Sequence, residues 1–205
     1  CNLATRNGIA PVYAMVKAGL NVALGIDEKG INDDEDPIME MRMIYYLHRQ
    51  AGTNLTQCPL LTPFDVLKMA TVNGAKPTGY EGQIGVLEPG MEADVILIDM
   101  DEILDQPWVS PDCSIANLFI HRGLGRHVNT VIIGGSLVMD QRKILTVDTE
   151  AIYKEAREQA DRGRTPDQLH YGNLLDKIKP YYQNWYNNWL QDLELTPFYY
   201  MNSRY

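Results

Sequence analysis

One carboxylate, Asp27, stands where enzymes of the α/β classes carry reactive groups. It follows the apolar run at residues 20–24 (LNVAL) and Gly25, a pattern typical of a short buried strand. In parallel barrels, functional side chains lie just past the carboxyl ends of the strands. A carboxylate there can bind a metal ion or take a proton from a metal-bound water. The same position also fits an aspartate that caps the following turn.

The first residue, Cys1, offers a different chemistry. A free N-terminal cysteine can act as a nucleophile with its own α-amine as the base. An N-terminal-nucleophile fold would begin with antiparallel strands, whereas the first element here is predicted to be a helix leading to a buried strand. The alternative interpretation is that Cys1 marks the point where the chain was cut. Cys1, Cys58 and Cys113 form no CxxC pair, so we expect no cysteine zinc site. Their odd number argues against a disulfide scaffold, so we expect a reducing compartment.

The histidines do not form a metal-binding motif. Neither HxH nor HExxH spacing occurs among His48, His121, His127 and His170. Isolated histidines of this kind are typical of solvated or hydrogen-bonding positions. A catalytic zinc usually takes three protein ligands, so the sequence offers one plausible ligand, Asp27, and does not complete a site.

An acidic run follows Asp27. Residues 28–36 hold five acids and one lysine, which is −4 of the net charge of −9. Calcium binding is a possible use, but the EF-hand spacing is missing. The run therefore favours a solvated loop ahead of a helix, whose N-terminal dipole attracts acids.

The composition limits the class of protein. The chain has 205 residues, 27 of them acidic and 18 basic, and 45% are hydrophobic. Such values predict a globular chain with a sizeable core, and we expect it in the cytoplasm. The acidity argues against nucleic acid as a partner. No apolar run reaches about 18 residues, so we expect no membrane-spanning helix.

The elements that must position Asp27 are predicted from turn and cap residues. Prolines favour the first turns of three helices, at Pro11, Pro37 and Pro63, the last after its cap Thr62. Glycines are expected to end these helices, at Gly19, Gly52 and Gly74. From about residue 82 the pattern becomes all-β, with strands predicted at 93–98, 128–133, 136–139 and 143–147. A helix is predicted at 149–162.

The C-terminal stretch is rich in aromatic residues. From residue 151 onward it holds 11 of the chain's 18 aromatic side chains, and YYQNWYNNWL is typical of an aromatic, polar helix. Tyrosine and tryptophan favour half-wet contacts. We expect this tail to pack on the body of the protein or on another subunit, with a direct role in substrate binding as the alternative.

Three blocks together resemble the amidohydrolase superfamily. In the first block, Cys1 and Asn2 align with the family's Ser-Asn pair, and GIAPV and NVALG follow. Asp27 aligns with the aspartate after the family's eighth barrel strand, and Asn32 falls within its Ser-Asn-Asn stretch. The second is LTPFDVLKMATVNGAKPTG, and the third is IGVLEPGMEADVILID, followed by the similar stretch HRGLGRHVNTVIIGGSLVMD. The branch it resembles holds cytosine and guanine deaminases, adenosine-analogue deaminases and s-triazine chlorohydrolases. The resemblance covers residues 1 to about 150.

The resemblance implies an α/β fold: the C-terminal part of a (β/α)8 TIM barrel plus part of a small β-sandwich, with a helical aromatic tail. Residues 1–81 would be the end of the barrel, 82–148 the C-terminal sandwich strands and 149–205 the extension. The histidine ligands would lie in the N-terminal part of the same enzyme, as a separate chain or a missing segment. Cys1 would then mark a break within a larger enzyme, and residues 1–205 alone should be inactive.

The resemblance also implies a mechanism. One divalent metal ion, zinc or iron, would activate water for hydrolysis of a C–N or C–halogen bond in a small cyclic substrate. Asp27 would be both metal ligand and proton shuttle. The substrate-binding residues would be Cys1, Asn2, Glu28 and Asn32.

Departures from the family pattern at Ile26 and Glu28 leave the substrate open. Two rival hypotheses remain: an N-terminal-nucleophile amidase that uses Cys1, and a non-catalytic amidohydrolase-like module. We expect a homo-oligomer without nucleic acid or membrane partners.

Overall fold

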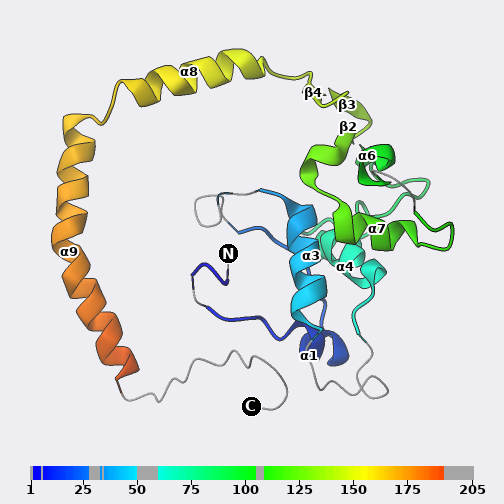
Figure 1. Cartoon of the computed structure of the whole chain (residues 1–205), viewed down its shortest axis with the longest axis horizontal. Coiled ribbons are helices and arrows are strands. Elements are labelled where there is room, and N and C mark those ends of the chain that lie inside the picture. Colours follow the sequence, from blue (N-terminus) through cyan, green and yellow to red (C-terminus); the bar gives the residue numbers. More distant parts are fainter. Residues whose placement is uncertain are drawn as a thin grey trace. The chain divides into compact units, whose positions relative to one another are not determined.

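The computed structural model describes residues 2–5, 7–27, 33, 35–49, 60–104 and 109–191. The chain divides into two units, Cys1–Thr146 and Val147–Tyr205. The first unit combines helices with one open antiparallel sheet (Figure 1). Its helices are α1 (Val12–Lys17), α3 (Pro37–Leu47), α4 (Pro63–Ala70), α5 (Val72–Ala75), α6 (Met100–Leu104), α7 (Ile115–Arg122) and the 3-10 turn η1 (Gly125–His127).

Two predicted helix starts are confirmed. Helix α3 begins at Pro37, and α4 begins at Pro63 after Thr62, whose hydroxyl accepts from the Asp65 N–H at 3.2 Å. The Asp65 carboxylate in turn accepts from the Thr62 N–H at 2.8 Å, which completes a capping box.

The end predicted at Gly19 is confirmed, since α1 ends at Lys17 and Gly19 has a φ of +75°. The other two predicted helix ends need correction. Helix α3 ends at Leu47 rather than at Gly52, because the chain turns there and the Arg49 N–H bonds the Tyr46 carbonyl. The helix predicted to run to Gly74 breaks at Thr71, whose backbone leaves the helical region and whose hydroxyl bonds the Leu67 carbonyl at 2.8 Å.

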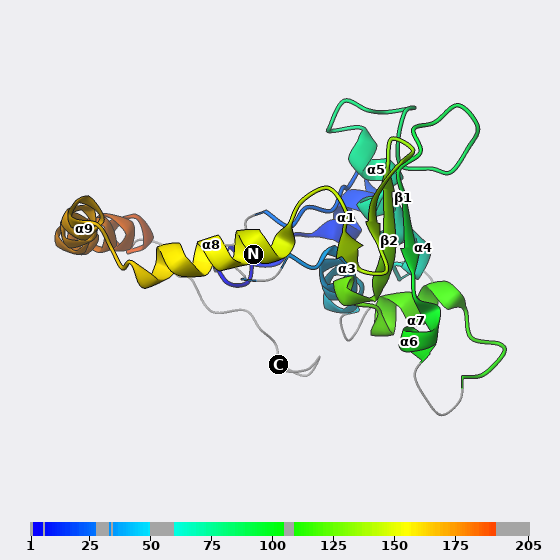
Figure 2. The ribbon, with the colours of Figure 1, turned by 90° about the horizontal axis from the view of Figure 1, so that it is seen from above.

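The sheet confirms the predicted meander. Strands β1 (Val95–Ile98), β2 (Val128–Ile133), β3 (Ser136–Asp140) and β4 (Lys143–Ile144) pair antiparallel in sequential order. Gly134 and Gly135, both at positive φ, form the two-residue turn between β2 and β3. The last strand is shorter than the predicted 143–147. Figure 2 shows β1 and β2 side by side, with α5 near one end of the sheet and α6 and α7 near the other.

Two apolar clusters hold the first unit together. The larger joins α3, α4, α6 and α7 and packs against Ile98 of β1 and Val128 of β2; its buried members are Ile38, Met41, Tyr45, Val66, Ile103, Phe119 and Ile120. The smaller consists of Val12, Leu61 and Met69, with Val22 and Leu24 packed against it.

The prediction of a strand at residues 20–24 is wrong. The segment has no helical or strand pairing. A β-strand is defined by its ladder to a neighbour, and within the described residues no strand lies beside this segment. Its backbone bonds α4 and α5 instead.

The second unit consists of α8 (Thr149–Asp161) and α9 (Pro166–Leu190), separated by Gly163 at φ +71°. Helix α8 ends one residue before the predicted position. The side chains of Asp148 and Thr165 cap the two helices. Among the described residues, no helix combines the length and the apolar character that crossing a membrane requires.

Candidate active site

The segment that leads to Asp27 is fixed by three hydrogen bonds to the α4–α5 region. The Leu24 N–H donates to the Met69 carbonyl at 2.8 Å. The Asn73 side-chain amide donates to the Val22 carbonyl at 2.9 Å, and the Asn21 amide donates to the Asn73 carbonyl at 2.9 Å. These bonds, with the packing of Val22 and Leu24, set the direction in which the chain reaches Asp27.

Asp27 itself lies at the end of this fixed segment. It is exposed, and its φ is +73°. Aspartate is among the few non-glycine residues that adopt this left-handed region readily. The chain therefore turns at Asp27 and leaves its carboxylate accessible, so that it can accept a proton or bind a cation.

The far end of the acidic run is anchored by Asp36. Its carboxylate accepts from the N–H groups of Ile38 at 2.9 Å and Met39 at 3.2 Å, which caps α3. It also accepts from the Gly125 N–H at 2.8 Å, across 89 residues of sequence. One side chain thus joins the start of α3 to η1, immediately before β2.

Helix α3 is further bound to α7 by Arg42. Its guanidinium donates from Nε to the Ile120 carbonyl at 2.9 Å and from Nη2 to the Gly123 carbonyl. Tyr46 also contacts α7, since its hydroxyl hydrogen-bonds His121 Nδ1. The α3 helix, which follows the Asp27 loop, is therefore held along its length.

The predicted substrate residues are only partly described. Asn2 is exposed in a turn, and its carbonyl accepts from the Asn7 N–H at 2.9 Å. Among the described contacts, none joins Asn2 to Asp27. Cys1, Glu28 and Asn32 lie outside the described residues.

The histidines have structural partners or separate positions. The ring of buried His127 accepts from the Leu124 N–H at 3.1 Å. His121 bonds Tyr46, and His170 lies on α9 in the second unit. His48 ends α3, where burial lowers the pKa of its imidazole below the ordinary value of 6.5.

A divalent metal is implied by the resemblance to amidohydrolases, and the donor set of the described residues shows whether it fits. The accessible Asp27 carboxylate suits one position of such a site. Within the described part of the chain, no group of three His, Cys, Asp or Glu side chains converges. The described residues therefore fit a metal as one ligand of several.

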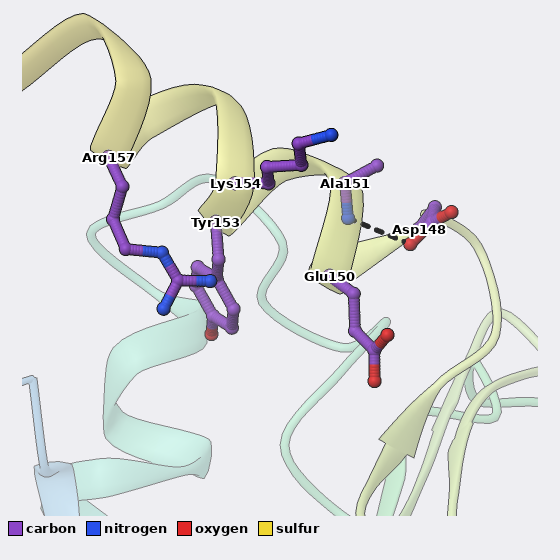
Figure 3. Close-up of a pocket in the computed structure, with 6 residues that line it drawn as sticks. All are labelled: Asp148, Glu150, Ala151, Tyr153, Lys154 and Arg157. Carbon is purple, nitrogen blue, oxygen red and sulfur yellow. Dashed lines mark hydrogen bonds between the residues drawn. The ribbon is translucent and has the colours of Figure 1, made fainter.

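A surface pocket occurs elsewhere, along α8 (Figure 3). Figure 3 shows that its lining side chains come from α8 and its cap, where Asp148 accepts from the Ala151 N–H at 3.0 Å. Ligand sites are usually enclosed by several elements. This pocket contains none of the predicted site residues and is not assigned a function.

Two residues that position the site were not singled out from the sequence. Asp36 was counted only as part of the acidic run, although an aspartate directly before Pro37 is a helix-cap signal. Asn73 lay within a recognised motif, but its bond to Val22 links positions 51 residues apart. Only the folded chain reveals that contact.

The first unit thus has a mixed α/β architecture and presents an accessible carboxylate, Asp27, at the end of an extended segment that hydrogen bonds hold. The model of the amidohydrolase family matches residues 1–138. The chain belongs to this family, as its motifs predicted.

The similar proteins are deaminases and a chlorohydrolase. A 5-methylthioadenosine/S-adenosylhomocysteine deaminase from Caldanaerobacter subterraneus is 36% identical over 159 residues, which are 78% of this chain and 35% of that protein. The chain thus spans about a third of this relative's length.

Two solved structures are similar in fold, and both bind zinc. A zinc-bound adenosine deaminase from Xanthomonas campestris has a TM-score of 0.67 at 28% identity, over 78% of this chain and 35% of that one. A zinc complex of atrazine chlorohydrolase from Arthrobacter aurescens has a TM-score of 0.66 at 25% identity, over 77% and 33%.

Proposed function

We propose that the enzyme containing this chain is a metal-dependent hydrolase that removes an amino group from a small cyclic substrate, an adenosine derivative. The observation that carries the proposal is the position of Asp27. An accessible carboxylate ends a segment that three hydrogen bonds hold, in a chain of the amidohydrolase family. The similarity to a methylthioadenosine deaminase and to an adenosine deaminase supports the substrate class.

Asp27 would act as metal ligand and as the group that holds a proton during turnover. A divalent ion, zinc or iron, supplies when bound the acidity that makes water a nucleophile near neutral pH. A carboxylate that accepts a proton at one oxygen can return it to the departing amine. Asp27 is exposed, as both roles require. Asn2, Cys1, Glu28 and Asn32 would contact substrate.

The chain would supply three parts of the enzyme. Residues 1–81 would form the end of a (β/α)8 barrel, 82–148 the C-terminal strands of a sandwich, and 149–205 an extension. The family match to residues 1–138 and the separation of Val147–Tyr205 as its own unit support this division. The remaining metal ligands would come from the N-terminal part of the same enzyme, in the cytoplasm.

Hydrolysis of a C–halogen bond is the second candidate. It is favoured by the similarity to atrazine chlorohydrolase, whose TM-score almost equals that of the adenosine deaminase. Both reactions need an activated water, and Asp27 would take the proton of that water in each. In deamination the proton would pass to the departing amine, whereas chloride leaves without a proton and Asp27 would release the proton to solvent.

The product distinguishes the candidates. The full protein, loaded with zinc, is incubated with methylthioadenosine, with adenosine and with a chlorinated triazine, while ammonia and chloride are measured separately. We expect ammonia from the adenosine compounds. Chloride release alone would favour the second candidate, and neither product from a zinc-loaded protein would refute the proposed activity.

A further inference from the structure

One face of α9 carries a regular series of apolar and aromatic side chains. Its members, called here the α9 seam, are Tyr171, Leu175, Ile178, Tyr182, Trp185 and Trp189. The steps between them alternate between four and three residues. That alternation is the 3.5-residue repeat by which one helix packs along another. The seam lies beyond the residues that match the family model, so the family's chemistry does not account for it.

The seam is not covered within its own unit. Trp185 is 57% exposed and Trp189 is 69% exposed, although their rings approach each other at 5.7 Å. The opposite side of α9 is mainly polar, with Asn173, Gln183 and Asn187, and it also carries Leu169 and Pro180. Contiguous exposed apolar surface with a polar reverse marks an interaction site. Figure 1 shows α9 as one long helix.

We propose that the α9 seam pairs with the same seam of a second copy of this protein, in antiparallel orientation. The series is symmetric about residue 180, so an antiparallel pair aligns its members in complete layers. Trp189 would face Tyr171 of the second copy, Trp185 would face Leu175, and Tyr182 would face Ile178. Each layer then occurs twice, as a two-fold interface requires.

The sizes of the side chains favour this orientation. The N-terminal half of the seam contains the aliphatic members Leu175 and Ile178, and the C-terminal half contains both tryptophans. An antiparallel pair places Trp185 against Leu175 and Tyr182 against Ile178, so that in these layers a ring meets a smaller aliphatic side chain and the two interdigitate well. The end layers pair the rings of Trp189 and Tyr171. A parallel pair would place Trp185 on Trp185 and leave the aliphatic layers loose.

The area of the seam is sufficient for a stable pair. An aromatic side chain buries roughly 150–250 Å². The seam and its borders Leu174, Tyr181 and Tyr186 comprise nine side chains, of which Ile178 is half-buried and the other eight are 42–77% exposed. Together they would bury on the order of 700 Å² per copy. Stable interfaces bury about 600–1,000 Å² per partner, and the area of the seam falls within that range.

The charges favour a protein partner over a lipid surface. Helix α9 contains two aspartates and two lysines, so its formal charge is zero, and its polar side consists mainly of amides. Helices that bind anionic membranes carry many basic residues on the polar face. A neutral helix also pairs with its own copy without strong net repulsion.

The first test compares two matched double variants of the full protein. Trp185→Glu with Trp189→Glu places two charges in the seam, whereas Gln183→Glu with Asn187→Glu places two charges on the polar side at the same spacing. Sedimentation equilibrium measures the mass of the assembly, and circular dichroism measures the helix content. We expect self-association to weaken by at least about tenfold in the seam variant and to stay unchanged in the polar-side variant. Equal masses for the two variants and the unaltered protein would overturn the inference.

The second test measures the orientation. Protein with Tyr171→Cys is mixed with protein carrying Trp189→Cys, and the mixture and each variant by itself are oxidised. The unaltered protein, oxidised in the same way, is the control for disulfides of the native cysteines. An antiparallel pair gives a disulfide in the mixture only. Disulfides between identical variants would show a parallel pair, and no disulfide in the mixture would show that the seams do not meet; either result contradicts the proposal.

Discussion

Replacing Asp36 with alanine removes three hydrogen bonds that described residues donate to one carboxylate. Two of them cap α3, through the N–H groups of Ile38 and Met39. The third, from the Gly125 N–H at 2.8 Å, connects α3 with η1. The substitution therefore tests both the helix start and the long-range link.

The two kinds of bond differ in expected energy. Loss of a helix cap costs typically about 1 kcal/mol, and a bond to a charged acceptor contributes about 1.5–3 kcal/mol. We expect Asp36→Ala to lower the free energy of unfolding by about 3 kcal/mol. Thr62→Ala is the matched control, because Thr62 caps α4 in the same unit and its bonds are confined to its own capping box. Its expected cost is about 1 kcal/mol.

Urea unfolding of the full protein, followed by circular dichroism, measures both variants. Hydrogen exchange at the Gly125 amide adds a local readout, since this N–H loses its acceptor in Asp36→Ala only. If Asp36→Ala costs no more than Thr62→Ala and Gly125 exchanges at an unchanged rate, the argument for the long-range link is refuted.

Two further predictions concern the surroundings of the site. Asn73→Ala leaves the Val22 carbonyl without its donor, so we expect a loss of roughly 1 kcal/mol of stability and a larger fall in turnover than in the control Thr78→Ala, whose hydroxyl donates to the nearby Gly74 and Ala75 carbonyls. Equal turnover in the two variants would contradict the positioning role. Burial lowers the pKa of His48 in the folded chain, so the imidazole takes up its proton at a higher pH in the unfolded chain than in the folded chain. The stability of the fold therefore decreases as the pH drops below 6.5. We expect His48→Gln to reduce the loss in melting temperature between about pH 7.5 and about pH 5.5, and an unchanged loss would show that this histidine is not responsible.

Local signals in the sequence predicted much of the fold. Pro37, the Thr62–Pro63 pair and the Gly134–Gly135 turn each restrict the backbone of their own neighbourhood, and the structure has the expected elements there. The three sequence blocks that resemble amidohydrolases also predicted the family correctly.

Contacts between distant residues were not predictable from such signals. The run at 20–24 has the composition of a strand, yet pairing depends on a neighbour, and the described segment bonds Met69 and Asn73 instead. The acceptor role of Asp36 toward Gly125 has no local signature beyond the cap. Helices α6 and α7 were missed because short amphipathic segments are hard to separate from loops.

The role of Asp27 is tested most directly by Asp27→Asn in the zinc-loaded full protein, with Asp33→Asn as its control. Both aspartates are exposed and have positive φ, at +73° and +55°, and asparagine tolerates that conformation equally well. The two variants should therefore keep the fold, which circular dichroism and the melting temperature check.

Ammonia release from an adenosine substrate is then measured for both variants. We predict that Asp27→Asn lowers kcat/KM by about a thousandfold or more, because proton transfer by a positioned carboxylate contributes about 10²–10⁴-fold and a metal ligand is lost as well. Asp33→Asn should keep the rate of the unaltered enzyme. A near-normal rate in Asp27→Asn would contradict the central claim.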